Sequence, residues 1–393
     1  MRQTHISREL AILIEAALAP VGELPFKVSD APLDPQKFMA LSKWHQVRPL
    51  AFEYAQSRSL ELPERVLRAL REFTLGQAVA NMAFLGICVR LYNRLTEQHV
   101  RAFPMKGALW AWKLYDKPTL REFGDIDFFI GKEDVSKSLD IFRTEGFAAD
   151  SYRHYLLNQQ SVMDDYLNTD YQLPLTPLQE HTLQSLEIQW NSTYPRYCYN
   201  FTWDELAANR VEFTMAGKSV LVPDTETQLI MMVIHHAGVE QWDKLKYMAD
   251  FVRLLDKFAD RLDWEYISRV AAAKGFYKLL LESLGVAGLL AGRDYLSAAG
   301  VPGQYPSPAF LQEMLAHWEN ERPSLQTKTW RIFLYNIKNR DRWSDKLSIV
   351  AAHISYLSHW RLLWHKLIWY RKRPLNEADR NRAVNAMTGR EDI

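Results

Sequence analysis

The chain has 393 residues, of which 48% are hydrophobic and 24% are charged, and this composition excludes a largely disordered chain. At this length we expect two or three domains. Because 48 Lys and Arg residues balance 47 Asp and Glu residues, the formal net charge is only +1. The sequence therefore gives no sign of the strongly basic surface that binds a long nucleic acid.

Cysteine usage and the N-terminal stretch indicate the compartment. Cys88 and Cys198 lie far apart, which excludes a disulfide framework and a cysteine-rich zinc site and suits a reducing environment. Glu9 and Glu15 fall inside the first apolar stretch, unlike the layout of a signal peptide. No apolar run reaches the roughly 18 residues that a membrane span needs. We expect a cytoplasmic protein without a transmembrane segment.

The first part of the chain, residues 1–99, has the three- and four-residue apolar spacing of helices. Asp34-Pro35 is a good helix start, because the carboxylate can cap the helix and proline suits its first position. A second start at Pro63 opens a long periodic stretch that reaches about residue 98. We expect this part to be a helical scaffold.

The second part, residues 100–222, mixes short apolar runs with helical stretches, as in an α/β or α+β unit. Residues 147–157 and 165–175 are ambiguous but extended in character. Gly146 is the expected left-handed cap of the helix before it. The remaining expectations are strands over 100–105, 125–131 and 183–191, helices over 107–115 and 133–145, and a hairpin over 211–223 that turns at Ala216-Gly217.

The third part, residues 223–393, returns to helical periodicity at Asp224. The aromatic stripe from Tyr356 to Tyr370 favours a core or subunit interface, so an oligomer through this helix is possible. Its basic neighbours leave a membrane surface or an acidic partner open as a second interpretation. The predicted fold class is α+β, with a small mixed-sheet domain flanked by N-terminal helices and a C-terminal helical bundle.

The most informative motif is Asp125-Ile126-Asp127 on the strand predicted over 125–131. Because side chains on a strand alternate, both carboxylates face the same side of the sheet. Such a pair is costly without a cation, and oxygen ligands are what Mg²⁺ prefers. We therefore predict a divalent-metal site, for Mg²⁺ or Mn²⁺, at Asp125 and Asp127.

Lys106-Gly107-Ala108 lies where a predicted strand meets a predicted helix, so backbone N–H groups and the helix dipole can face a phosphate. Gly107 permits close approach of the backbone. Lys106 and Arg121 could add positive charge at the same phosphates.

Glu187 is the candidate for a third carboxylate, since it lies on the strand predicted over 183–191 with its apolar neighbours pointing to the other side. Near a metal, it would either complete the metal cage or accept the proton of an attacking hydroxyl.

These residues together resemble the nucleotidyltransferase fold shared with DNA polymerase beta and the aminoglycoside nucleotidyltransferases. The similarity is closer to the bacterial uncharacterised nucleotidyltransferase family, which carries a Lys-Gly start, an Arg shortly before Asp-x-Asp, and a Glu-x-His-Trp strand. The helical part of that pattern matches His235, Leu245 and Asp250 here. Two departures stand out, because Ala108 replaces the superfamily serine and Gln189 replaces the strand histidine.

The resemblance implies a metal-dependent enzyme that moves a nucleoside monophosphate from an NTP to a hydroxyl-type acceptor, a small molecule or a protein, and releases pyrophosphate. It also makes Gln189, His235, Lys246 and Asp250 candidates for substrate binding. Ala108 and Gln189 leave open a catalytically silent nucleotide-binding protein. The helical C-terminal half leaves open an interaction protein on the same fold.

Overall fold

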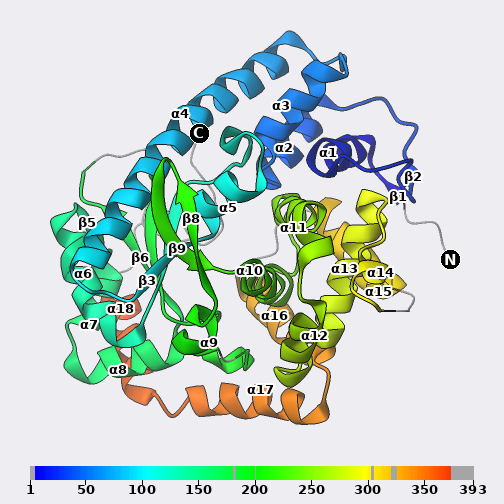
Figure 1. Cartoon of the computed structure of the whole chain (residues 1–393). Helices are drawn as coiled ribbons and strands as arrows, with labels where there is room; N and C mark the ends of the chain where they lie inside the picture. Colours follow the sequence, from blue (N-terminus) through cyan, green and yellow to red (C-terminus); the bar gives the residue numbers. More distant parts are fainter. Residues whose placement is uncertain (1–4, 180–182, 200, 302–304, 320–324, 373–393) are drawn as a thin grey trace.

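A computed structural model describes residues 5–179, 183–199, 201–301, 305–319 and 325–372. A small mixed sheet with its own helices lies beside a larger set of C-terminal helices, and the N-terminal helices pack against both (Figure 1). The predicted α+β class is therefore confirmed.

The N-terminal part is helical, as predicted. Asp34 caps α2, because its side chain accepts hydrogen bonds from the backbone N–H groups of Gln36 and Lys37. The stretch after Pro63 forms one continuous helix of 34 residues. The elements are β1 (His5–Ile6), α1 (Arg8–Leu18), β2 (Lys27–Val28), α2 (Pro35–Trp44), α3 (Arg48–Ser57) and α4 (Glu64–Glu97).

Helix α4 corrects the expectation that no stretch is long and apolar enough to cross a membrane. By length and composition it qualifies, with a mean hydropathy of 1.3 in its best window, of which 28% is buried. It is the one such helix in the described ranges, and a single helix of this kind is weak evidence for a membrane protein. Its side chains Leu70, Phe84 and Leu91 belong to the core of the protein.

A five-stranded sheet in the order β3-β4-β7-β6-β5 forms the centre of the second part. Strands β4 and β7 run parallel, and the other neighbours are antiparallel. Three strands predicted from the sequence are confirmed, since they correspond to β3, β4 and β7. The bounds are β3 (Ala102–Met105), β4 (Asp125–Ile130), β5 (Phe147–Ala149), β6 (Gln172–Pro177) and β7 (Ser185–Gln189).

The predicted hairpin is also present, formed by β8 (Arg210–Met215) and β9 (Lys218–Pro223). Its two-residue turn places Ala216 at φ 49° and Gly217 at φ 75°. Positive φ at both positions matches the twist of the paired strands. Gly146, with φ 90°, follows the predicted helix as expected. The helices of this part are α5 (Lys106–Leu114), α6 (Val135–Thr144) and α9 (Trp203–Ala207).

Two segments expected to be extended are partly helical. Residues 147–149 form β5, but α7 (Ser151–Leu157) follows at once, because Asp150 caps it by accepting from the backbone N–H of Arg153. Helix α8 (Gln160–Thr169) likewise precedes β6. The extended prediction is therefore wrong for 151–157 and for 165–169, where a cap and packing decide the structure.

The third part is helical from Thr225 onward, with Asp224 as the predicted cap. Residues Val233–Val239 form a π-helix, an uncommon form that is frequent at functional sites. The α-helices are α10 (Thr225–Met232), α11 (Leu245–Phe258), α12 (Trp264–Ala273), α13 (Tyr277–Ala291), α14 (Tyr295–Ala298), α15 (Pro308–Glu319), α16 (Leu325–Asn339), α17 (Trp343–Tyr356) and α18 (Trp360–Lys372).

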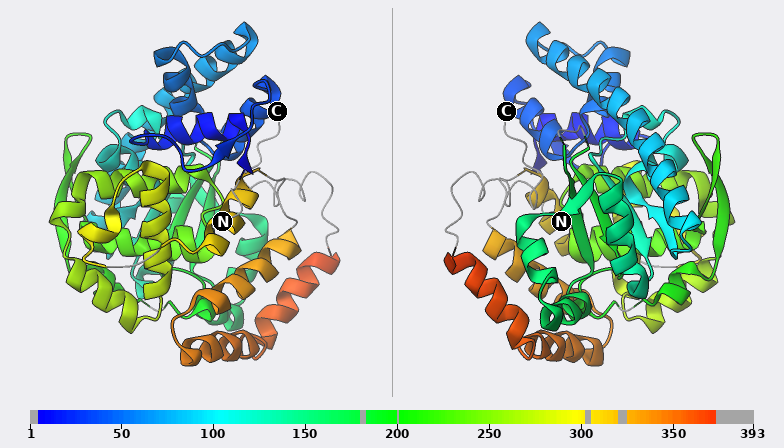
Figure 2. Two further views of the ribbon diagram at one scale, coloured as in Figure 1. Left: turned by 90° about the vertical axis from the view of Figure 1, so that its right-hand side faces the viewer. Right: turned by 90° about the vertical axis from the view of Figure 1, so that its left-hand side faces the viewer.

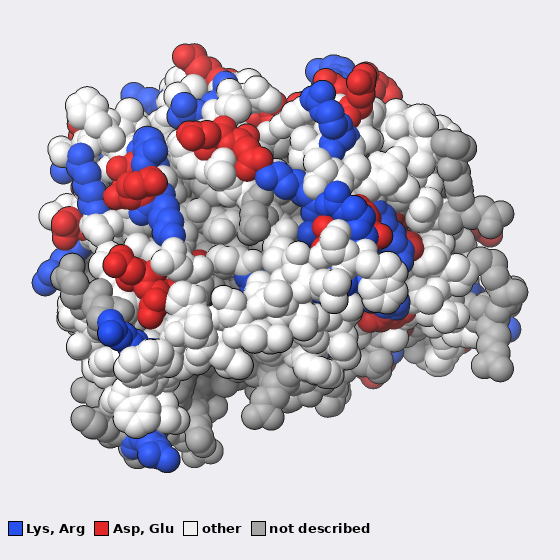
Figure 3. All heavy atoms as spheres, turned by 90° about the horizontal axis from the view of Figure 1, so that it is seen from below, with Lys and Arg blue, Asp and Glu red and all other residues white. Residues whose placement is uncertain are grey.

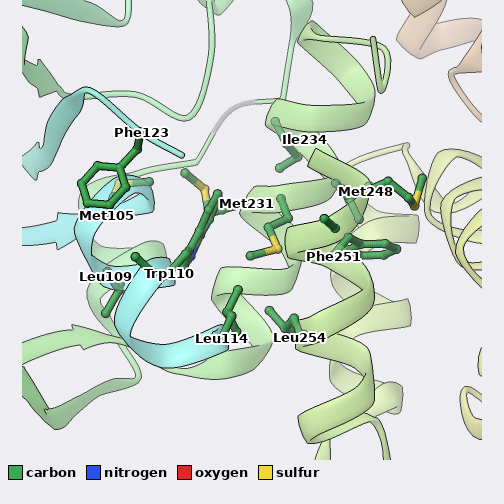
Figure 4. Packing of buried hydrophobic residues seen from close by; sticks show 14 of the residues in the cluster. Met105, Leu109, Trp110, Leu114, Phe123, Met231, Ile234, Met248, Phe251 and Leu254 are labelled. Carbon is green, nitrogen blue, oxygen red and sulfur yellow. The ribbon is translucent and has the colours of Figure 1, made fainter. Parts of the chain in front are cut away.

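One continuous core joins the second part of the chain, residues 100–222, to the C-terminal helices. This second part, with the five-stranded sheet, is called the sheet domain below. Figure 4 shows Trp110 and Leu114 of α5 facing Met231 of α10 and Leu254 of α11, and all four side chains are buried. Burial of apolar side chains on both sides stabilises this contact by roughly 1.5–3 kcal/mol per large side chain. The core therefore fixes α11 relative to the start of α5 and the strands behind it.

Helices α16, α17 and α18 form a bent arm at the edge of the molecule (Figure 2). The inner side of α18 packs on the sheet domain, where the ring centroids of Trp369 and Tyr155 are 5.3 Å apart. Leu362 is fully buried, but Trp360 and Trp364 are exposed. One face of α18 thus belongs to the core, as expected, and a subunit interface on the exposed face stays a prediction.

Candidate active site

The candidate acids come together on two neighbouring parallel strands. Asp127 of β4 and Glu187 of β7 are directly paired in the ladder, and Asp125 is paired with Ser185. The side chains of Asp125, Asp127 and Glu187 therefore point to the same face of the sheet, as the alternation of side chains along a strand predicts. Asp127 is 2% exposed, whereas Asp125 and Glu187 are partly exposed.

The environment of Asp127 and Glu187 raises the pKa of both carboxyl groups. Burial raises the pKa of Asp127, and the neighbouring charge of Asp125 adds to the effect, while Lys106 opposes it. Burial also raises the pKa of Glu187, followed by repulsion from Asp127 and Asp125. Raised pKa values mean that the negative charge on this face is not fully balanced by the protein.

The side chain of Gln189, on the same face of the sheet, contacts both Asp127 and Glu187. Its side-chain Nε2 donates to Asp127 Oδ1 at 2.7 Å and lies 3.4 Å from Glu187 Oε2. The same nitrogen is 3.2 Å from Gln172 Oε1 of β6. Gln189 stands where the family that the sequence resembles carries a histidine. Its neutral amide group therefore donates the hydrogen bond that orients the carboxylates.

The turn from β3 into α5 approaches the acids closely. Lys106 adopts φ 44°, a left-handed conformation that is strained for a lysine, and its Nζ lies 3.6 Å from Asp127 Oδ1. A Cβ at Gly107 would lie 2.8 Å from the backbone O of Asp125, so only glycine fits. The close approach predicted at Gly107 is thus an approach to the neighbouring strand. Ala108 is buried directly behind it.

Arg121 and Asp250 form a buried ion pair. The guanidinium donates from Nε to Asp250 Oδ1 at 2.9 Å and from Nη2 to Asp250 Oδ2 at 2.8 Å. A third hydrogen bond runs from Nη1 to the carbonyl of Gly107 at 3.2 Å. Tyr115 also donates to Asp250 Oδ1, at 2.9 Å. Two residues predicted separately as ligand contacts therefore bind each other and link the sheet domain to α11.

Lys246 lies at the start of α11, one helical turn before Asp250. Burial, together with the positive charges of Arg121 and Lys244, lowers its pKa to about 8, while Asp125 and Asp250 oppose the shift. Asp125 and Arg121 of the site are among the charges that act on this ammonium group. A bound anion would stabilise the charged form of this ammonium group.

His235 and His236 occupy the π-helix at the edge of the site. His236 is buried, its pKa is held well below the usual value by burial, and its ring stacks on Tyr247 with 4.4 Å between centroids. His235 Nδ1 lies 3.3 Å from His236 Nδ1. The structure therefore makes His236 a packed neutral ring and leaves His235 partly exposed beside it.

The donor set suits a hard divalent cation. Asp125, Asp127 and Glu187 offer carboxylate oxygens, and their mutual repulsion is the kind of charge that Mg²⁺ offsets. Within the described ranges, no three His, Cys, Asp or Glu side chains already stand in a metal-binding group. In this conformation Lys106 and Gln189 hold the Asp127 carboxylate instead.

The sequence does not predict three residues at the site, Gln172, Tyr171 and Tyr247. Gln172 contacts Gln189 from β6, and Tyr171 lies near enough for Glu187 and Asp127 to raise its pKa further after burial. The available signal is the polar residues before the short apolar run in 171–175, but the pattern of this segment does not decide for a strand. Tyr247 was likewise not distinguished from ordinary core aromatics.

Comparison with known families gives the assignment. The model of the family described as uncharacterised nucleotidyltransferases matches residues 31–292, which include every site residue described above. The chain belongs to this family. It is thus a nucleotidyltransferase, and NTP is the expected donor substrate. No curated protein matches the chain.

Solved structures show weak overall similarity. The solution structure of the antibiotic-resistance factor ANT(2'')-Ia has 14% identity and a TM-score of 0.34, and the match covers 49% of this chain and 91% of that one. A crystal structure of an antigenic nucleotidyltransferase-like protein from Paracoccidioides brasiliensis has 16% identity and a TM-score of 0.35, over 55% and 90% of the two chains. Similarity at this level carries no argument about the acceptor.

Proposed function

We propose that this nucleotidyltransferase moves a nucleoside monophosphate from an NTP to a hydroxyl-type acceptor, a small molecule or a protein, and releases pyrophosphate. In this reaction the acceptor oxygen bonds to the α-phosphorus while the bond from that phosphorus to the bridging oxygen of the β-phosphate breaks. The observation that carries the proposal is the face formed by Asp125, Asp127 and Glu187 beside the β3–α5 turn.

Each site residue has a role in this proposal. Asp125 and Asp127 would hold Mg²⁺ or Mn²⁺, which would neutralise the triphosphate charge and orient the phosphates. Lys106 and the backbone after it would contact the phosphates, and Lys246 would add a second positive charge. Arg121 would position the β3–α5 turn through Gly107 and α11 through Asp250.

Glu187 would accept the proton of the acceptor hydroxyl or contribute a further metal ligand. Its raised pKa supports the first role, because a carboxylate with a pKa closer to neutrality is a better base once ionised. Gln189, which binds Asp127, and His235 would orient the substrate.

The test is a screen of pyrophosphate release from each of the four common NTPs, with Mg²⁺ or Mn²⁺ and with and without a pool of small metabolites. Metal-dependent release that rises with the metabolite pool is the expected result.

A catalytically silent nucleotide-binding protein is the second candidate. The observation that favours it is the hydrogen bond from the Gln189 amide to the Asp127 carboxylate, a proposed metal ligand. Magnesium-dependent NTP binding without any pyrophosphate release would decide for it.

A further inference from the structure

The helical arm at the C-terminal end exposes far more large apolar side chains than its length predicts. Ten of the seventeen exposed large hydrophobic residues of the described chain lie between residues 330 and 367. A folded protein rarely leaves such a continuous apolar surface without a partner. These ten are Trp330, Leu334, Trp343, Leu347, Val350, Ile354, Leu357, Trp360, Trp364 and Leu367.

On α17 and α18 these residues form one outer stripe. Their spacing alternates between three and four residues, so on each helix they share a face. Trp343 is 78% exposed, Trp360 63% and Trp364 53%. Seen from below, the face on which α17 lies has a broad area without Lys, Arg, Asp or Glu, and charged side chains gather toward its margins (Figure 3).

The opposite faces of the same helices are already occupied. His359 of the turn before α18 binds Asp165 at 2.8 Å, and His365 of α18 contacts Tyr155 at 2.9 Å. On α17, Ile349 is fully buried. The arm is thus anchored by its inner side, and its outer stripe is a surface rather than a loosely packed core.

The charge of this segment selects the partner. Residues 346–372 contain no Asp or Glu, and their Lys and Arg residues are Lys346, Arg361, Lys366, Arg371 and Lys372. Arg361 and Arg371 are exposed beside the apolar stripe. A symmetric second copy would bring two such cationic surfaces together, which opposes self-association. Exposed tryptophan next to arginine suits the boundary between lipid headgroups and acyl chains.

We propose that the outer face of α17 and α18 binds the surface of an anionic phospholipid membrane. The apolar stripe enters the headgroup region, and Arg361 and Arg371 pair with lipid phosphates. This face lies outside residues 31–292, the part of the chain that the family shares. Membrane binding would therefore bring the enzyme to a membrane surface, and it does not depend on the reaction proposed for the active site.

The test is cosedimentation of the purified full-length protein with vesicles of phosphatidylcholine, with and without phosphatidylglycerol. Binding is expected only with phosphatidylglycerol and is expected to weaken with salt. The variant Arg361→Gln/Arg371→Gln should bind roughly tenfold more weakly or worse, since each cation contributes to the attraction. Trp360→Ser/Trp364→Ser/Leu367→Ser should abolish binding.

Matched controls lie on α4, which also exposes apolar and cationic residues. Arg65→Gln/Arg68→Gln and Leu75→Ser/Val79→Ser/Met82→Ser should leave vesicle binding unchanged. Absence of binding, equal binding to both vesicle types, or loss caused by the α4 variants would overturn the proposal. A concentration-dependent dimer in sedimentation, removed by the α18 triple variant without any vesicle binding, would assign the face to a second copy instead.

Discussion

Arg121 and Asp250 join the sheet domain to the C-terminal helices through two hydrogen bonds of 2.9 and 2.8 Å between fully enclosed side chains. The same guanidinium binds the carbonyl of Gly107 in the first turn of α5. One arginine thereby sets the position of the β3–α5 turn and of α11 against the acids of β4. The geometry of the proposed active site depends on this pair.

Arg121→Met is expected to lower the free energy of unfolding by about 3–5 kcal/mol, because it leaves the carboxylate of Asp250 buried without a partner. The double variant Arg121→Met/Asp250→Leu should lose less than the sum of the two single changes. Chemical denaturation measures all three. Lys117→Met, which breaks the exposed pair with Glu53, is the control and should change stability by less than about 1 kcal/mol.

Gly107→Ala tests the close approach of the β3–α5 turn to β4. The added Cβ would stand 2.8 Å from the backbone O of Asp125, and backbone cannot move aside easily. We expect a loss of about 1–3 kcal/mol and a lower thermal midpoint. Gly76→Ala on α4 meets no atom within 4 Å and should be neutral or slightly stabilising. Equal effects of both substitutions would contradict the packing described for Gly107.

His45 makes folding stability depend on pH. Its ring is fully buried, Nδ1 accepts from the backbone N–H of Leu245, and Nε2 is 3.2 Å from the carbonyl of Trp318. Burial lowers its pKa from 6.5 to about 3. The lowered pKa means that the unfolded chain binds the proton first as the pH falls.

The stabilising contribution of neutral His45 is therefore present above pH 6.5 and is lost as the pH falls toward 3, by at most about 1.4 kcal/mol per pH unit. His45→Gln cannot titrate, so its stability should change less over this interval. Denaturation at several pH values measures the slope. His154→Gln, at an exposed position, should keep the wild-type slope, and an unchanged slope in His45→Gln would count against this account.

Glu187→Gln tests the uncompensated charge beside Asp127. The pKa of Glu187 is raised in the folded protein. Ionisation of Glu187 therefore lowers the free energy of unfolding as the pH rises above the pKa of a glutamate in the unfolded chain. Without added metal, the variant should therefore gain thermal stability over the wild type at pH 8, and the difference should vanish in acid.

Added Mg²⁺ should raise the thermal midpoint of the wild type at pH 8 and raise that of Glu187→Gln less, since a bound ligand stabilises the folded state. Glu61→Gln, an exposed acid on another surface, is the control and should respond like the wild type. Identical metal responses in all three proteins would argue against a metal at these acids.

The sequence alone predicts the parts of the site that follow from local periodicity. Strand alternation places Asp125, Asp127 and Glu187 on one face, and the glycine at 107 marks the tight turn. Local patterns contain no information on partners far along the chain. The pairing of Arg121 with Asp250, 129 residues away, therefore could not be predicted, although both residues were selected as candidates.

The same limit applies to α7 and to the outer face of α18. A capping carboxylate at Asp150 and packing against α18 decide that 151–157 is helical, while its composition suits a strand equally well. For α18, aromatic residues on all sides give no indication of which face the rest of the chain covers. Only the fold separates Leu362, which is buried, from Trp360, which is not.

The most direct measurement of the central claim is transfer of label from an NTP carrying ³²P at the α-phosphate to acceptors in a metabolite pool, with Mg²⁺ present. Asp127→Asn should abolish both label transfer and pyrophosphate release while its thermal midpoint stays at or above that of the wild type. The exposed control Asp140→Asn should retain full activity. Undiminished transfer by Asp127→Asn would contradict the assignment of the β4 carboxylates as the catalytic centre.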